Sequence, residues 1–213
     1  MNKAIPIVIG TAIAILIGVA ITTSNSLQIQ EPQIEQKEQS LAYLTINKLI
    51  KEKLESQQIH MSSPIKLSRQ DDLQKYCSFF TDPAKQELVE YCTSTELKDI
   101  HDDFLGNIHM VGSPNEPKIT LVLVKVNQTM GQIDSVKIIF DTTVQSVVCD
   151  CWAQQKPGGL DNIGQWVDGL QQFHQSGSKP HSKSNELILD GKTMQMELSQ
   201  NEGGFLWQFF IYN

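Results

Sequence analysis

The sequence lacks the motifs by which the common catalytic centres are identified. It contains no G-x-S-x-G nucleophile turn, no H-E-x-x-H zinc motif, no glycine-rich phosphate loop followed by lysine, and no C-x-x-C redox pair. The chemistry of these classes depends on fixed spacings, so the sequence excludes their usual forms. A hydrolase whose catalytic residues are distant in sequence and meet only in the folded chain stays an alternative.

The sequence also lacks any cluster of lysine and arginine with interleaved aromatic residues. The chain has 213 residues, with 24 acidic and 17 basic side chains and a net charge of −7. A surface of this sign repels a row of phosphates, so nucleic acid is excluded as a partner. No polybasic patch follows the first apolar run, so any membrane attachment must depend on that run itself.

Long apolar runs are absent except at the start of the chain. Residues 4–21 (AIPIVIGTAIAILIGVAI) carry no charge, which is close to what a helix needs to cross about 30 Å of hydrocarbon. We predict that residues 1–22 are a transmembrane anchor or a signal peptide, since small residues follow at Thr22–Ser24. Lys3 precedes the run and Glu31 follows it, which predicts a cytoplasmic N-terminus and an extracytoplasmic remainder, or a secreted protein after cleavage.

Three regions follow from composition and periodicity. Residues 23–40 are rich in Gln, Glu, Ser and Thr and are predicted to be a flexible polar linker. Residues 41–213 are predicted to be one extracytoplasmic domain. It begins with an amphipathic helix over 41–60 and continues with helices over 71–109.

The helices expected within 71–109 are three. The first has Leu73, Tyr76, Cys77 and Phe80 on one face, and the second begins with the N-cap Asp82 followed by Pro83. The third starts from Thr93–Glu96, which has the pattern of a capping box, and it carries apolar residues at helical spacing up to His109.

A sheet is predicted over 117–213. Strands are expected at 119–126, 136–141 and 144–152, then a helix from Leu160, then a hairpin at Asp190-Gly191, and a last aromatic strand at 205–212. The fold class is therefore α+β, with a mostly antiparallel sheet of about six strands in the order β-β-β-α-β-β-β.

The four cysteines are predicted to form disulfides, because the compartment is oxidising. Along a strand, Cys149 and Cys151 would have Cα atoms almost 7 Å apart, at the limit for a bond, so cross-bridges to Cys77 and Cys92 are favoured. Two local pairs are the alternative, and a metal site or reactive thiols at the same four residues is the third. Cys149 and Cys151 are the residues on which a redox or metal function would depend.

Other candidate sites have ordinary structural interpretations. His101 and His109 are expected on a helix surface, and His174 and His181 flank a loop. Asn127-Gln128-Thr129 is a glycosylation sequon, with Asn127 as the acceptor. The aromatic strand at 205–212 is expected in the core, and at a sheet edge it would instead accept a partner strand.

The sequence thus predicts a membrane-anchored extracytoplasmic binding, sensing or assembly domain, stabilised by disulfides, without catalytic residues or a cofactor. Its expected partners are the bilayer, through residues 1–22, and a protein or a small apolar ligand. The alternative is an extracytoplasmic thiol-redox or copper- or zinc-handling protein that uses Cys149 and Cys151.

Overall fold

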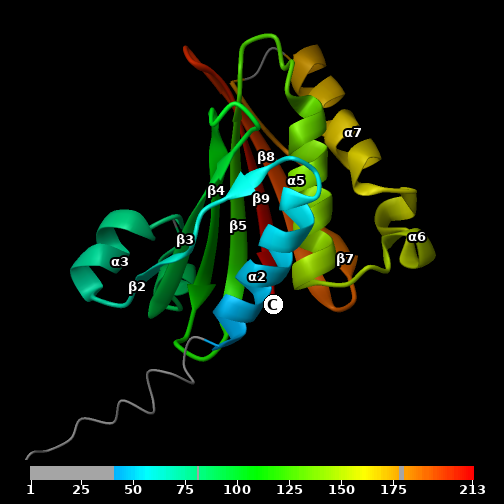
Figure 1. Ribbon diagram of the computed structural model, residues 1–213. Helices are drawn as coiled ribbons and strands as arrows, with labels where there is room; N and C mark the ends of the chain where they lie inside the picture. Colours follow the sequence, from blue (N-terminus) through cyan, green and yellow to red (C-terminus); the bar gives the residue numbers. More distant parts are fainter. Residues whose placement is uncertain (1–40, 81, 178–179) are drawn as a thin grey trace, which may run out of the picture. The chain divides into compact units, whose positions relative to one another are not determined.

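The computed structural model describes residues 41–80, 82–177 and 180–213, which form an α+β domain (Figure 1). All of its strand pairings are antiparallel and join nine strands into one sheet, in the order β1-β3-β4-β5-β9-β8-β6, with β2 also paired to β3 and β7 to β8. The predicted α+β class with a mostly antiparallel sheet is confirmed. The predicted count of about six strands and the order β-β-β-α-β-β-β are wrong, because the described residues form five strands before residue 133 and four after residue 177. The predicted anchor and linker lie outside the described residues.

The strands are β1 (His60–Met61), β2 (Ile65–Leu67), β3 (Tyr91–Lys98), β4 (Phe104–Gly112), β5 (Pro117–Val126), β6 (His181–Lys183), β7 (Leu187–Leu189), β8 (Lys192–Asn201) and β9 (Gly204–Tyr212). Strand β9 lies in the middle of the sheet, between β5 and β8. The edge position under which the aromatic strand would accept a partner strand is therefore wrong.

Three long helices cover one face of the sheet: α2 (Leu41–Glu55), α5 (Ile133–Val147) and α7 (Ile163–Gly177) (Figure 1). Their apolar side chains and those of the strands below form the main core. In β9 the residues that face this core alternate with residues on the other side of the sheet, as the pleat requires. The core-facing residues of β9 are Phe205, Trp207, Phe209 and Ile211.

The opposite face is covered in part by the segment that contains α3 (Gln70–Tyr76) and α4 (Pro83–Gln86). This segment closes a second, smaller core around Cys77 and Cys92. Phe79 lies against the ring of His109, with ring centres 4.4 Å apart, and the ammonium of Lys85 lies 4.3 Å from the ring centre of Tyr212. The sheet is thus sandwiched between helices only where this segment crosses it.

Both edges of the sheet are interrupted by a serine. In one edge Ser62 follows β1, donates its backbone N–H to the Glu96 carbonyl and accepts the Glu96 N–H on its hydroxyl, both at 2.9 Å. In the other edge Ser184 follows β6 and does the same with Met196, at 2.9 and 3.0 Å. The hydroxyl replaces a carbonyl of the ladder, and the edge strands are only two or three residues long. Such short edges disfavour pairing with another sheet.

Two predicted assignments are wrong. Residues 93–109 form β3 and β4 in place of a helix, and the two β-branched threonines Thr93 and Thr95 are buried side chains of β3. The turn between these strands is closed by the Asp99 carboxylate, which accepts the backbone N–H groups of His101 and Asp103 at 2.8 and 3.0 Å. The pattern read as a capping box is therefore a strand with threonines on one face.

Residues 136–141 and 144–147, predicted as strand, belong to the helix α5, whereas residues 148–151 form a turn and Trp152 begins the short helix α6 (Trp152–Gln155). The residues of α5 that the core buries recur at helical spacing, and they include Val136, Ile139, Phe140 and Val144. The spacing of Val136, Ile138 and Phe140 is too short a pattern to separate the two periods, and Ile139 between them is itself apolar and buried.

Several local predictions are confirmed. Asp190 and Gly191 have φ angles of 49° and 76° and join β7 to β8 in a two-residue turn. The buried strand predicted at 119–126 is β5, and the helix predicted from Leu160 is α7. The Asp82 carboxylate caps α4 by accepting the Ala84 N–H at 3.0 Å.

The substitution Ser184→Ala tests whether the serines that interrupt the sheet edges contribute to stability. It removes the acceptor of the Met196 N–H, which lies in the sheet beside a fully buried side chain, so the free energy of unfolding should fall by about 1–3 kcal/mol. Urea unfolding of the full chain measures this. The control Ser176→Ala, at an exposed position of α7, should change it by less than about 0.5 kcal/mol. Equal losses in the two variants would contradict the assigned role.

Candidate functional site

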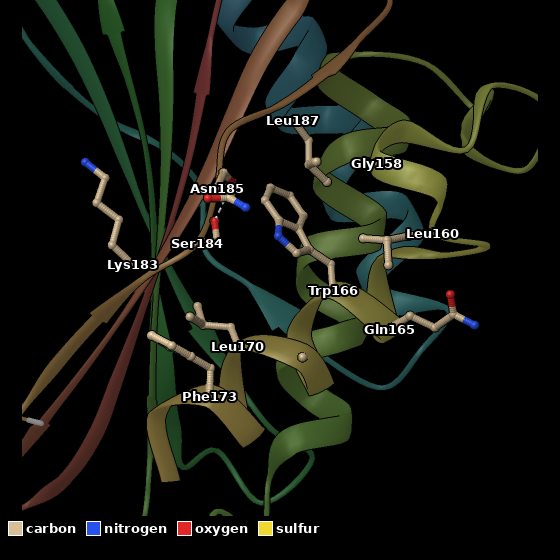
Figure 2. Close-up of a pocket in the computed structure, with 11 residues that line it drawn as sticks. Gly158, Leu160, Gln165, Trp166, Leu170, Phe173, Lys183, Ser184, Asn185 and Leu187 are labelled. Carbon is tan, nitrogen blue, oxygen red and sulfur yellow. Dashed lines mark hydrogen bonds between the residues drawn. The ribbon is translucent and has the colours of Figure 1, made fainter. Parts of the chain in front are cut away.

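A pocket of about 420 Å³ lies between α7 and the interrupted edge of the sheet (Figure 2). Three segments that are distant in sequence line it. They are the loop around Gly158, the outer side of α7 from Gln165 to Phe173, and the edge residues from Lys183 to Leu187. Pockets of about 300–1,000 Å³ with mainly apolar walls are typical of small-ligand sites.

The start of α7 fixes one wall of the pocket. The Asn162 side chain accepts the Gln165 backbone N–H at 3.0 Å, and the Gln165 side chain accepts the Asp161 N–H at 2.8 Å. This reciprocal arrangement satisfies N–H groups that a helix start leaves free. It also holds the Gln165 amide against Asp161, and Figure 2 shows that side chain pointing away from Trp166.

Trp166 is the central side chain of the pocket. It is 7 % exposed, and its ring packs edge-on against Phe209 of β9, with ring centres 6.0 Å apart. Leu170 and Leu187 approach it from α7 and β7 (Figure 2). The structure gives the indole N–H of Trp166 no hydrogen-bond acceptor among the described residues, so this donor is free for a ligand.

The other polar groups at the pocket are mostly engaged elsewhere. Figure 2 shows the Lys183 side chain extending away from Trp166, and its ammonium lies 3.4 Å from the Glu197 carboxylate. The Ser184 hydroxyl accepts from Met196 and donates to the Asn185 carbonyl at 2.8 Å. The side-chain amide of Asn185 is exposed and is the second polar group free to meet a ligand. The pocket therefore has no charged group directed into it among its described lining residues.

Gly158 lets the loop approach the sheet edge. Its φ is 63°, and a Cβ at this position would lie 2.7 Å from Cδ2 of Leu187. Any other residue would be strained and would push Leu187 away. The turn at Gly158 thus forms part of the wall of the pocket.

The cysteines form two local pairs, Cys77 with Cys92 and Cys149 with Cys151. The favoured cross-bridges are wrong, because Cys149 and Cys151 do not lie on a strand. They follow α5, where the chain turns and the Cys149 N–H donates to the Val144 carbonyl at 3.1 Å. The turn shortens their Cα separation to 5.2 Å, inside the range for a disulfide.

The two pairs differ in what they add to stability. Cys77 and Cys92 are fully buried and are separated by 15 positions, so their bond stabilises the fold by about 3 kcal/mol in the chain-entropy model. Cys149 and Cys151 are only two positions apart, which gives about 1.6 kcal/mol in the same model. The first pair is therefore well suited to hold the α3–α4 segment on the sheet, and the second restrains much less of the chain.

A second cavity of about 250 Å³ lies beside Cys149. Its lining includes the carboxylates of Asp141, Asp150 and Asp161. Burial, and then the charge of Asp150, raise the pKa of Asp141 above its ordinary value. The ammonium of Lys156 lies 2.7 Å from Asp161, so this third carboxylate is paired.

The histidines considered as metal ligands lie apart. His101 is in the exposed β3–β4 turn and His109 is on β4, where both had been expected on one helix. No group of three or more histidine, cysteine or carboxylate side chains with metal-site geometry occurs in the described part of the chain. Both cysteine pairs are oxidised, so they offer no thiolates for a four-cysteine site.

His174 and Ser182 form a buried hydrogen bond between α7 and β6, with Nδ1 and Oγ 2.9 Å apart. Each residue is 4 % exposed, and Nε2 of the histidine has no partner among the described residues. A nucleophilic serine needs access to substrate and a group that orients its histidine. This pair has neither feature and is an internal contact.

The sequon residues Asn127 and Thr129 lie in the exposed loop between β5 and α5. The side-chain oxygen of Asn127, Oδ1, accepts hydrogen bonds from the backbone N–H groups of Thr129 and Gly131, both at 3.1 Å, and from the Thr129 hydroxyl at 2.8 Å. This leaves the Asn127 amide nitrogen at the surface. Glycosylation of Asn127 stays a prediction.

Across residues 41–80, 82–177 and 180–213, none of the helices has the length and apolarity to cross a bilayer. Comparisons with known proteins add no relative: no family model matches the chain, and no curated protein or solved structure is significantly similar to it. Function must therefore be argued from the geometry.

Acid should destabilise the fold through His109. Burial under Phe79 lowers its pKa from 6.5 to about 4, whereas the unfolded chain keeps a pKa near 6.5. The unfolded state thus binds more protons between these values. The contribution of neutral His109 to the free energy of unfolding is fully present above about pH 6.5 and is lost as the pH falls toward 4.

The variant His109→Phe should flatten this dependence, measured as the free energy of urea unfolding at about pH 7 and about pH 5. His174, whose pKa is also lowered by burial, leaves a residual slope of the same sign. The exposed control His101→Gln should keep the full slope. A wild-type slope in His109→Phe would show that this group is not the cause.

Proposed function

We propose that residues 41–213 are a ligand-binding domain held outside the cytoplasm by the N-terminal segment, and that the pocket on α7 is its binding site. The proposal assigns no catalytic step to this pocket. One observation carries it: a buried tryptophan with a free N–H, flanked by the apolar side chains of Leu170 and Leu187, stands at the centre of a pocket of about 420 Å³.

The lining defines the class of ligand. Leucine and aromatic side chains form the apolar part of the walls, and among the described lining residues the free polar side-chain groups are the indole donor and the exposed Asn185 amide. No charge is directed inward from the described lining residues, so nothing would compensate the desolvation of a charged ligand. The expected ligand is compact, neutral and mainly apolar, with one hydrogen-bond acceptor.

The ketone-bearing fluorophore prodan has these properties and serves as a probe. We expect it to bind the full chain, with increased emission and quenching of tryptophan. Trp166→Ala should weaken binding at least about tenfold, and Trp166→Phe about fivefold, since the latter keeps an aromatic ring but removes the donor and part of the ring surface. The control Ile188→Ala removes an apolar side chain that is 68 % exposed on β7 and should leave Kd unchanged. Unchanged binding in Trp166→Ala would reject the site.

The extracytoplasmic location is a separate proposal, supported by the apolar run at residues 4–21, the charge on its two flanks and the oxidised cysteine pairs. Alkaline phosphatase fused after Asn213 tests it in a bacterial host, because this enzyme is active only when exported and the C-terminal residue is exposed. We expect activity from the full chain and its loss when residues 1–22 are deleted. An inactive full-length fusion, with the protein present in the cytoplasm, would contradict the location.

A further inference from the structure

The bond between Cys149 and Cys151 differs from a structural crosslink in three respects. The two cysteines are only two positions apart in the sequence. They lie in the turn that follows α5, and both are partly exposed. The Cys77–Cys92 bond has none of these properties, since both of its residues are 0 % exposed. A bond that restrains little of the chain and can be reached from solvent is suited to exchange.

The two sulfurs also differ from each other. Cys149 is one of the residues that line the cavity of about 250 Å³, and this is the side from which we expect an incoming thiol to approach. The Cys151 sulfur accepts a hydrogen bond from the side-chain amide of Gln155, at 3.2 Å, from the first turn after it. A donor at this position stabilises a thiolate on Cys151 and makes it the better leaving group.

We propose that Cys149–Cys151 is a thiol–disulfide exchange site, at which a partner thiolate attacks the Cys149 sulfur and Cys151 leaves. The sulfur–sulfur bond breaks, a mixed disulfide forms between the partner and Cys149, and the Cys151 thiolate takes a proton from water. A second partner thiolate then attacks the partner's sulfur in the mixed disulfide. The two partner thiols leave as a disulfide and the protein gains two electrons as a dithiol. With an oxidised partner the same steps run in reverse.

The charges around the cavity select the partner. Asp141 and Asp150 face it without an ion-pair partner among the described residues, whereas Asp161 is neutralised by Lys156. Lys53, which donates to Gln145 at 3.1 Å, and Lys192, which donates to the Val147 carbonyl at 2.6 Å, keep their positive charge but do not line the cavity. An anionic thiol is therefore repelled, and the expected partner carries its thiol on a neutral or basic molecule.

The oxidised full chain tests the proposal with two small thiols, cysteamine as the cationic probe and glutathione as the anionic probe. Thiols are counted by maleimide labelling and mass spectrometry. We expect Cys149 and Cys151 to become reduced while Cys77 and Cys92 stay paired. At equal thiolate concentration and low salt, cysteamine should react at least about threefold faster than glutathione. Opening of Cys77–Cys92 first, or opening of both pairs only on unfolding, would overturn the proposal.

Single variants test the direction of attack. In Cys151→Ser the remaining Cys149 thiolate should attack the disulfide cystamine and accumulate a mixed disulfide, with one cysteamine leaving, and in Cys149→Ser the remaining Cys151 should have the lower thiol pKa, read from the pH dependence of its alkylation. Adding Gln155→Ala to Cys149→Ser should raise that pKa, and the exposed control Gln172→Ala should not. A Cys151 pKa that does not respond to Gln155 would remove the assigned leaving group.

Discussion

The pairing of β9 with β5 is the constraint on which the rest of the domain depends. Eight residue pairs, from Ile119 with Tyr212 to Val126 with Phe205, place the last strand of the chain in the middle of the sheet. The halves of the domain before and after α5 are thereby joined into one ladder. The same register directs Phe209 toward the helices, where it supports Trp166. Without this long-range pairing, α7 would lose the sheet surface that it covers, and Trp166 would lose its contact with Phe209.

How much of this could be predicted depended on whether local sequence decides the conformation. The turn at Asp190-Gly191 is specified by two residues that tolerate positive φ, so its hairpin was predictable. Thr93–Glu96 fits both a capping box and a strand, and only pairing with β2 and β4 decides between them. The helix from Leu160 was predictable as an element, with Trp166 at its margin, but its meeting with Leu187 of β7 is a tertiary contact that no local pattern contains. The cysteine pairing failed for the related reason that Cys149 and Cys151 were placed on a strand, whereas the chain turns there.

Two sites with different properties lie on either side of one pair of tryptophans. Trp152 follows Cys151 directly, donates its N–H to the Leu160 carbonyl at 3.0 Å and packs 6.1 Å from Trp166. The larger pocket has leucine and aromatic side chains in its walls and no charged group directed into it among its described lining residues, whereas the smaller cavity is lined by three carboxylates and by Cys149. A neutral ligand and a basic thiol would therefore choose different sites. The buried pair that fastens α3 and α4 to the opposite face takes part in neither and serves the stability of the fold.

The central claim, that the pocket on α7 binds a neutral apolar ligand through Trp166, is tested most directly by the indole N–H signals in a ¹H–¹⁵N spectrum of the full chain. The three tryptophans give three such signals, and that of Trp207 comes from a fully buried ring in the main core. On titration with prodan, the account predicts a saturable shift of the Trp166 signal and a constant Trp207 signal. A Trp166 signal that stays in place while prodan binds would contradict it.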